Sequence, residues 1–355
     1  MLKKFRDNID TIDKKILKLL NQRADIAKNV AEYKKSSNNT LIFRPERESQ
    51  IIKKLRALNK GPLDSNHIHN IYREIISACL SLETNLNVSF LGPEGTYSQI
   101  AARKFFGNSV SSDSKNNLSE VFDSVRNNTS DYGVVPIENS NQGSIKATIE
   151  FLLKYDVKIC GEQNIPIRHT LMSKSKSYER IKKIYAHSQT LSQCSNWINN
   201  NMPNAECITT DSNAKAALLA NKLKNSACIA SETCSKLYKL KINASNINDS
   251  HDNTTRFLII GNSEIAESKN DKTTFVMTLE NKSGSLSKVL QILSENRISM
   301  TKIESIPTKE KNWEYLFLID ITGHKYNKKI SNALNKIEKI SRYYQLLGSY
   351  PKSID

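Results

Sequence analysis

The 355-residue sequence lacks any apolar run close to the roughly 18 residues that a membrane-spanning helix needs, and it lacks low-complexity tracts. Its first residues, MLKKFRD, are charged and have no apolar core of the kind that secretory signals carry. The six cysteines show no C-x-x-C pair and no zinc-binding spacing, which predicts reduced thiols and no metal site. We therefore expect a cytoplasmic protein with two or three globular domains.

Arginine is scarce among the basic residues, because 13 Arg stand beside 39 Lys in a chain of formal net charge +16. A nucleic-acid-binding surface would need a dense basic face with arginines and stacking aromatic rings. Here the lysines are spread along the chain among many Asn and Ile residues. Nucleic acid is therefore not an expected partner, although the positive charge would help to attract an anionic small molecule.

The first module, residues 1–86, contains no Pro or Gly before Pro45, and its apolar residues recur every three or four positions from Phe5 onward. This periodicity predicts one amphipathic helix of about 33 residues, on the order of 50 Å long. So long a helix needs a partner along it, most simply a second copy of the chain. Two further helices are predicted, one from Pro45 and one from the capping residue Asp64 to Glu83.

Cations on the long helix fall into two groups. Arg23 and Lys34 are eleven residues apart, about three turns, so they share one face, whereas Arg6 lies about a quarter turn away. Arg6 is therefore better placed to serve the site of a partner chain. In the third predicted helix, Glu83 lies one turn after Cys79 and shares its inward face.

These residues lie in the motifs FRDNID, LLNQRADIA, AEYKK, RPERE and IISACLSLE, which together resemble the all-helical chorismate mutases, a family of intertwined dimers. Chorismate rearranges to prephenate without a nucleophile, so such a protein must hold a dicarboxylate and stabilise charge on the ether oxygen. The resemblance implies carboxylate-holding arginines, a glutamate on the ring hydroxyl, and Lys34 with a protonated Glu83 at the ether oxygen. The catalytic residues so implied are Arg6, Arg23, Lys34, Arg47, Glu48 and Glu83, with Arg44 and Cys79 as further substrate contacts.

From about residue 88 the pattern changes to alternating strands and helices, which predicts an α/β domain with two lobes around a cleft over residues 88–265. A strand at 88–91, the turn Gly92–Thr96 and a helix opening at Tyr97 would place backbone N–H groups around an anion. Polar clusters stand at other strand ends, where ligands of α/β sheets tend to bind. Further strands are expected at 132–135, 158–161, 183–185, 227–230 and 257–260.

The motifs FLGPEGTYSQIAA, VVPIENSNQGSI, AHSQTLSQC and NTTRFLII resemble prephenate dehydratase along its entire length. The resemblance implies loss of carbon dioxide and water from prephenate, with Thr255 as the essential proton donor. A threonine hydroxyl is a poor acid, so Glu138, His187 or a relayed water would have to assist it. Thr255 and Arg256 are expected to share one buried mouth, with Arg256 holding a carboxylate. The implied substrate-binding residues are Glu138, Asn139, Ser140, His187, Gln193 and Arg256.

The last module, residues 272–350, shows a βαββαβ order, with strands at 273–280, 298–305, 313–321 and 343–348. This order predicts a ferredoxin-like sheet with helices on one face. It resembles the ACT domain, an amino-acid-sensing module, which implies phenylalanine as effector, while a purely structural dimerisation domain remains an alternative. The implied effector-binding residues are Gly284, Ser285, Leu286, Ser287, Glu304, Ser305, Ile306 and Pro307.

The sequence thus predicts a multidomain enzyme with an all-α module, a two-lobed α/β module and a ferredoxin-like ACT module. It resembles the bifunctional chorismate mutase/prephenate dehydratases of phenylalanine biosynthesis. The resemblance implies that chorismate and prephenate are its substrates, that it needs no metal or organic cofactor, and that it is at least a homodimer. The competing interpretation is a ligand-binding regulator whose catalytic residues have decayed, and the complete motif sets argue against it.

Overall fold

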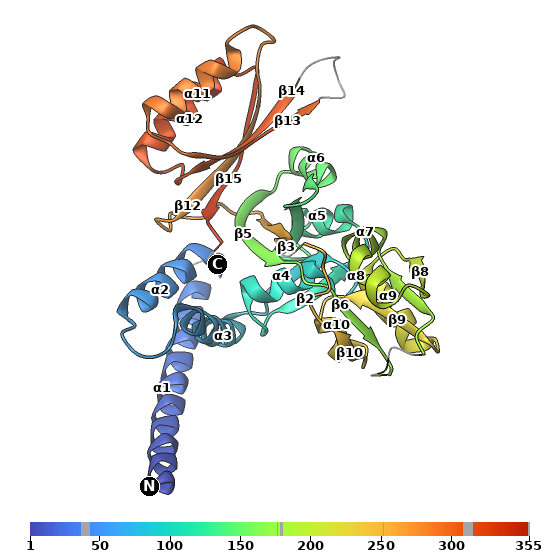
Figure 1. Cartoon of the computed structure of the whole chain (residues 1–355). Helices are drawn as coiled ribbons and strands as arrows, with labels where there is room; N and C mark the ends of the chain where they lie inside the picture. The colour runs from blue at the N-terminus through green and yellow to red at the C-terminus, as the bar shows by residue number, and fades with distance from the viewer. Residues whose placement is uncertain (37–42, 176, 178–179, 251, 308–314, 354–355) are drawn as a thin grey trace. The chain divides into compact units, whose positions relative to one another are not determined.

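The computed structural model of the chain describes residues 1–36, 43–175, 177, 180–250, 252–307 and 315–353 (Figure 1). The described residues form two compact units. Unit 1 comprises residues 1–87, 103–111 and 263–352, and unit 2 comprises residues 88–102, 112–262 and 353. Unit 1 therefore contains the helical module and the C-terminal sheet, whereas unit 2 contains the α/β module.

The helical module has the three predicted helices: α1 (Leu2–Ser36), α2 (Pro45–Leu58) and α3 (Ser65–Glu83). Pro45 occupies the first turn of α2, where its missing N–H costs nothing. Asp64 caps α3, because its Oδ1 accepts from the backbone N–H groups of Asn66 and His67, at 2.8 Å each. The start of α2 at Pro45, the end of α3 at Glu83 and the capping residue Asp64 are thus confirmed.

α1 is one uninterrupted helix, and the apolar side chains along one stripe of it are exposed in the described chain. Phe5 is 57% exposed, Ile9 56% and Ile26 63%, although such residues are usually buried. The stripe continues through Ile12, Ile16, Leu19, Val30 and Tyr33, all of them exposed. Contiguous exposed apolar surface of this kind is typical of protein–protein contact sites.

The first lobe of unit 2 is a mixed sheet in the order β2-β1-β3-β11-β5, with β4 paired to β3. β1 and β3 are parallel, and β11 runs antiparallel to its neighbours β3 and β5. Gly133 of β3 allows close packing, since a Cβ there would lie 2.9 Å from side-chain atoms of Ile260 and Val121. The elements are β1 (Asn87–Leu91), α4 (Tyr97–Phe106), β2 (Ser111–Lys115), α5 (Leu118–Arg126), β3 (Tyr132–Asn139), β4 (Gly143–Ser144), α6 (Lys146–Lys154), β5 (Lys158–Pro166) and β11 (Thr254–Gly261).

The second lobe of unit 2 is a five-stranded sheet in the order β10-β6-β9-β7-β8. β9, buried along its whole length, lies between β6 and β7, and the alanine-rich helix α9 contributes to the same core. The chain enters this lobe after β5 and leaves it before β11, so two crossing segments join the lobes. The elements are β6 (Thr170–Ser173), β7 (Lys183–Ala186), α7 (Ser188–Gln193), α8 (Ser195–Asn201), β8 (Glu206–Thr209), α9 (Asn213–Lys222), β9 (Ser226–Ala230), α10 (Thr233–Leu237) and β10 (Lys241–Ala244).

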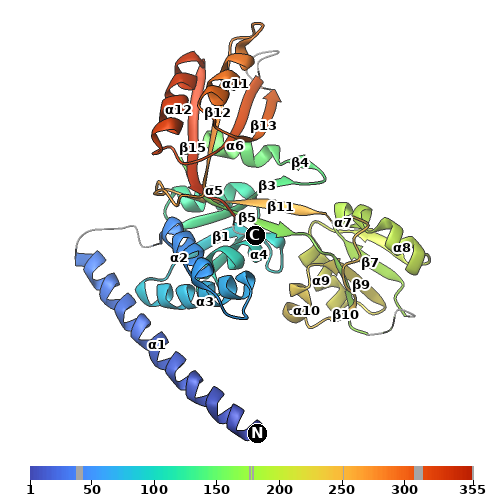
Figure 2. The same ribbon diagram turned by 60° about the vertical axis from the view of Figure 1, so that its left-hand side comes forward.

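The C-terminal sheet has four antiparallel strands in the order β13-β14-β12-β15, which is the predicted ferredoxin-like arrangement. Helices α11 and α12 cover one face of the sheet, where Phe275, Val289 and Ile337 lie in one core (Figure 2). The elements are β12 (Asp271–Thr278), α11 (Ser285–Glu295), β13 (Met300–Pro307), β14 (Tyr315–Thr322), α12 (Lys328–Ile340) and β15 (Tyr343–Pro351). The first two residues of the strand predicted at 313–321 lie outside the described residues.

The predicted fold class is confirmed, and the differences are short strands. β2 and β8 were not predicted, since their residues, SSDSK and ECIT, lack a buried apolar face. β4, β6 and β10 have four residues or fewer, too short for an alternating pattern to appear. No helix in the described ranges is both long enough and apolar enough to span a bilayer.

Candidate functional site

Thr255 and Asn139 form the centre of the candidate site in unit 2. Thr255 is the second residue of β11, Asn139 is the last residue of β3, and the two are direct partners in the antiparallel register. Both side chains are buried, and Asn139 Nδ2 donates to Thr255 Oγ1 at 2.9 Å. The structure thus brings two predicted site residues together, 116 positions apart in the chain.

Residues of both crossing segments extend this pair into a hydrogen-bonded chain. Asn139 Nδ2 also bonds Asn253 Oδ1 at 2.8 Å, and Asn253 Nδ2 donates to Gln193 Oε1 at 3.1 Å. The same Gln193 oxygen lies 2.9 Å from His169 Nε2. His169 Nδ1 faces the hydroxyl of Tyr97 at 3.5 Å, and that hydroxyl donates to the Arg168 carbonyl at 2.6 Å. A series of hydrogen bonds therefore links polar side chains of β3, α7, α4 and both crossing segments to Thr255.

Burial decides the charge state of the two titratable groups at the far end of this chain. Burial lowers the pKa of His169, although its bond to Gln193 raises it, so the imidazole is neutral near pH 7. Burial also raises the pKa of the Tyr97 phenol, which therefore stays protonated. The chain from Tyr97 to Thr255 thus consists of neutral groups.

Arg256 does not share the surroundings of Thr255. Neighbouring side chains on a strand point to opposite faces, and Arg256 pairs in register with Glu138 rather than Asn139. Its Nε lies 2.7 Å from Glu162 Oε2 and its Nη1 lies 3.8 Å from Glu138 Oε2. The geometry therefore separates the guanidinium from the hydroxyl, contrary to the expectation of one shared mouth. Arg256 as a holder of a substrate carboxylate stays a prediction.

Three other predicted groups of unit 2 make local bonds. Ser140 Oγ donates to the Asp252 carbonyl and accepts from Thr254 N–H, at 3.0 Å each. It therefore links the end of β3 to the start of β11. His187 Nδ1 accepts from Gln189 N–H at 3.3 Å, which caps α7. In the turn that was expected to bind an anion, Gly95 N–H already donates to Gln99 Oε1 at 2.8 Å. Substrate contacts of these residues remain predictions.

In the helical module the structure brings together two pairs of charged side chains. Lys34 Nζ lies 3.2 Å from Glu83 Oε2, with side chains 20% and 15% exposed. Arg73 Nη1 lies 2.5 Å from Glu48 Oε2 and also donates to the Phe105 carbonyl. Burial raises the pKa of Glu48 to about 7, whereas Arg73 and Arg23 lower it. Glu48 therefore titrates near neutral pH.

The other predicted mutase residues differ in their exposure. Arg6, Arg44 and Arg47 are exposed, Arg23 is partly exposed, and Cys79 is buried. Along the straight helix α1, Arg6 and Lys34 are 28 residues apart, about 42 Å. A molecule of the size of chorismate cannot contact both in one chain.

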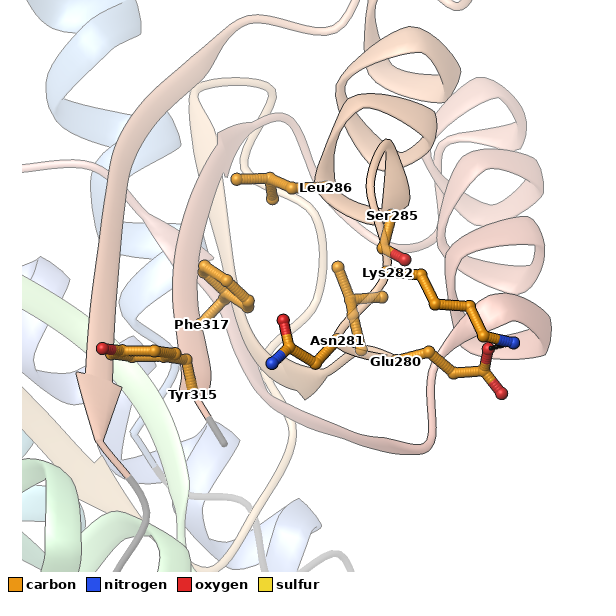
Figure 3. A pocket seen from close by; sticks show the side chains of 8 residues that line it. Glu280, Asn281, Lys282, Ser285, Leu286, Tyr315 and Phe317 are labelled. Atoms are coloured by element: carbon orange, nitrogen blue, oxygen red, sulfur yellow. Dashed lines mark ion pairs between the residues drawn. The ribbon is translucent and has the colours of Figure 1, made fainter. Parts of the chain in front are cut away.

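The C-terminal module contains a cavity of about 170 Å³ (Figure 3). Tyr315 and Phe317 of β14 line one side of it, and the Lys282 ammonium is paired with the Glu280 carboxylate at 2.6 Å on its rim. Two of the predicted effector residues, Ser285 and Leu286, line the cavity, whereas Gly284, Ser287 and the segment Glu304–Pro307 do not. The remaining lining residues are Leu279 and Asn281.

Several residues of these sites were missed by sequence reasoning. His169 and Glu162 stand in no recognised motif, and their partners are distant in the chain. A signal for Arg73 was present, because it lies three and seven residues before Ile76 and Leu80 and so faces the buried side of α3. Within the described ranges, no group of three or more His, Cys, Asp or Glu side chains is placed to hold a metal ion.

Comparison with known proteins gives the family. Three family profiles match in order: Chorismate mutase type II at residues 5–84, Prephenate dehydratase at 88–265 and ACT domain at 273–339. A bifunctional chorismate mutase/prephenate dehydratase of Aquifex aeolicus is 41% identical over 357 residues, 99% of this chain and 98% of that protein.

Two solved structures agree with these matches. The prephenate dehydratase of Arthrobacter aurescens in complex with L-Phe has a TM-score of 0.68 and 29% identity, covering 75% of this chain and 90% of that one. The prephenate dehydratase of Staphylococcus aureus has a TM-score of 0.66 and 28% identity, covering 75% of this chain and 100% of that one. The chain therefore belongs to the family of bifunctional chorismate mutase/prephenate dehydratases, enzymes of phenylalanine biosynthesis that join an isomerase and a lyase in one polypeptide.

Proposed function

We propose that Thr255 is the proton donor with which unit 2 converts prephenate into phenylpyruvate. The observation that carries the proposal is the bond from Asn139 Nδ2 to Thr255 Oγ1. Because the amide donates, the hydroxyl oxygen accepts and its own hydrogen is left for another acceptor. Within the described chain, Asn139 is the hydrogen-bond partner of this hydroxyl. The free hydrogen is thus available to a departing hydroxyl group of the substrate.

The reaction balance shows what the site must supply. The bond between the ring carbon and its carboxylate breaks, carbon dioxide leaves, and its electron pair moves into the ring. The bond to the ring hydroxyl breaks at the other end, and the hydroxyl leaves as water after taking one proton. Each turnover therefore consumes one proton from the medium, which must return to Thr255. Neither Glu138, on the other face of the sheet, nor His187, which caps α7, bonds Thr255, so a relayed water best fits this role.

Purified protein supplied with prephenate tests this proposal. Wild type and Thr255→Ser should form phenylpyruvate, because both carry a hydroxyl, whereas Thr255→Val, of the same shape without the hydroxyl, should not. Activity of Thr255→Val near the wild-type level would contradict the role of Thr255. Absence of phenylpyruvate formation in wild type would instead favour a ligand-binding regulator.

For the first module, we propose a chorismate mutase site built from Arg23, Lys34, Arg47, Glu48 and Glu83, with Arg6 from the partner subunit. The distance of about 42 Å between Arg6 and Lys34 along one helix supports a contribution from a second chain. The exposed apolar stripe of α1 supports the same conclusion, because a second α1 would cover it. Arg44 and Cys79 remain proposed substrate contacts. The homodimer would be the working form of the module.

For the C-terminal module, we propose phenylalanine as a feedback effector that binds at the cavity beside α11. Tyr315, Phe317 and Leu286 give the cavity an apolar part, and the Lys282–Glu280 pair gives it charges of both signs for an amino acid's ends. The Arthrobacter relative was solved with L-Phe. Phenylalanine should raise the melting temperature and lower the dehydratase rate, and tyrosine is the matched control.

We also propose that the protein is cytoplasmic. All six cysteines are free thiols, which supports a reducing compartment.

A further inference from the structure

The direction of the hydrogen-bonded chain at Thr255 is fixed by one backbone group. Asn141 N–H donates to Asn139 Oδ1 at 3.1 Å. A backbone N–H can only donate, so the amide oxygen of Asn139 must face it. The Asn139 nitrogen therefore faces Thr255 and Asn253, and the hydrogen bonds exclude the opposite assignment of oxygen and nitrogen.

The donor and the acceptor of each further hydrogen bond, from Asn139 to His169, follow in the same way. Asn139 Nδ2 donates to Asn253 Oδ1, so Asn253 must turn its nitrogen toward Gln193. Gln193 must then present its oxygen, which carries no hydrogen. His169 Nε2, 2.9 Å from that oxygen, can only approach it as a donor. His169 therefore carries its hydrogen on Nε2.

Two donors, His169 Nε2 and Asn253 Nδ2, hold the Gln193 oxygen and thereby fix the position of the nitrogen of the same amide. Gln193 is the last residue of the short helix α7 and is partly exposed, so its side chain is not held by packing alone. With its oxygen fixed by His169 and Asn253, both hydrogens of Gln193 Nε2 are left for a ligand, since no described residue accepts from it. An NH₂ group aimed in this way suits a carboxylate or a keto oxygen.

His169 is itself held rigidly. Its side chain is 2% exposed, its backbone N–H donates to Asn248 Oδ1 at 2.6 Å, and Asn248 Nδ2 donates to the Ile167 carbonyl at 3.0 Å. Its ring lies edge-on to Tyr97, with ring centres 6.1 Å apart. A buried donor that holds a partly exposed amide is an arrangement that positions a binding group.

We propose that His169 is a positioning residue of the dehydratase. Its Nε2–H fixes the Gln193 amide so that the NH₂ group faces the substrate, and the amide chain then leaves the Thr255 hydrogen free to be donated. The inference rests on the proposed function of Thr255, and it assigns to His169 a role that acts through Gln193 rather than by contact with prephenate. The alternative is that His169 is a buried histidine with a purely structural role in packing.

The test compares His169→Leu with His169→Gln in the full-length chain. Leucine removes the donor, whereas the Gln amide nitrogen can replace Nε2. We expect kcat for prephenate to fall about tenfold in His169→Leu and to recover to within about threefold of wild type in His169→Gln. Mutase activity of the same samples reports folding and should not change. Equal loss in both variants, or full activity of His169→Leu, would overturn the proposal.

A double-mutant cycle separates action through Gln193 from general damage. If His169 acts through Gln193, then adding His169→Leu to Gln193→Met should cost less than about twofold. Independent, multiplicative losses would overturn the inference. Loss of phenylpyruvate formation in Thr255→Val beside full activity of His169→Leu would refute the positioning role alone, whereas activity of Thr255→Val would refute the proposed function itself.

Discussion

Replacing Arg73 by methionine removes the charge that faces Glu48 and leaves an apolar side chain in its place. The two groups are 2.5 Å apart, and their side chains are 12% and 10% exposed, so solvent screens the pair only weakly. Burial already raises the pKa of Glu48 to about 7, against the opposing effect of Arg73. Without Arg73, the pKa of Glu48 should rise further, and the carboxyl should stay protonated to a higher pH in the folded chain.

The magnitude follows from linkage between protonation and folding. The pKa of Glu48 is raised on folding from 4.5, so its contribution to stability is complete below pH 4.5 and is lost as the pH rises through the folded pKa. Between pH 6 and pH 8, a folded pKa of about 7 loses about 1.3 kcal/mol, and a carboxyl that stays protonated throughout loses at most about 2.7 kcal/mol. The destabilisation caused by Arg73→Met should therefore be larger at pH 8 than at pH 6, by up to about 1.4 kcal/mol.

Denaturant titrations of wild type and Arg73→Met at the two pH values measure this difference, with the helical circular dichroism signal as the probe. The loss of the bond to the Phe105 carbonyl lowers stability equally at both pH values, so it does not enter the difference. Glu48→Gln combined with Arg73→Met is the matched control, because it has no carboxyl to titrate. The reasoning is refuted if Arg73→Met is equally destabilising at pH 6 and pH 8.

Three further predictions concern the other parts of the chain. Ile9→Asp places a charge in the apolar stripe of α1 and should lower mutase activity at least tenfold while prephenate conversion persists, and unchanged mutase kinetics would argue against a mutase dimer built on α1. Tyr315→Ala should weaken the thermal shift caused by phenylalanine without changing the dehydratase rate in its absence, and an unchanged shift would place the effector elsewhere. Glu162→Gln weakens the hold on Arg256 and should raise KM for prephenate less than Arg256→Met does, which steady-state kinetics of both variants would show.

The fold could be predicted from the sequence wherever one physical pattern dominated. The 3.6-residue period of α1, the cap at Asp64 and the βαββαβ order each follow from local chemistry, and each is confirmed. Short strands such as β2 and β8 could not be predicted, because their stability comes from pairing with neighbours and not from their own residues.

The candidate sites were predictable only in part, for a related reason. Motifs located Thr255 and Asn139, but no local pattern joins His169 to Gln193, 24 residues later, or Glu48 to Arg73, 25 residues later. Strand alternation alone would have separated Thr255 from Arg256, so the expectation of one shared mouth failed on a rule that the sequence already contained. Of the residues that line the cavity beside α11, Ser285 and Leu286 were predicted. Tyr315 and Phe317 were missed, because they come from a strand that carries no motif.

The most direct test of two independent reaction sites is to supply Thr255→Ala protein with chorismate and to follow prephenate and phenylpyruvate over time. The account predicts that prephenate accumulates at the wild-type rate and that no phenylpyruvate forms. Equal loss of both reactions, or continued formation of phenylpyruvate, would contradict it.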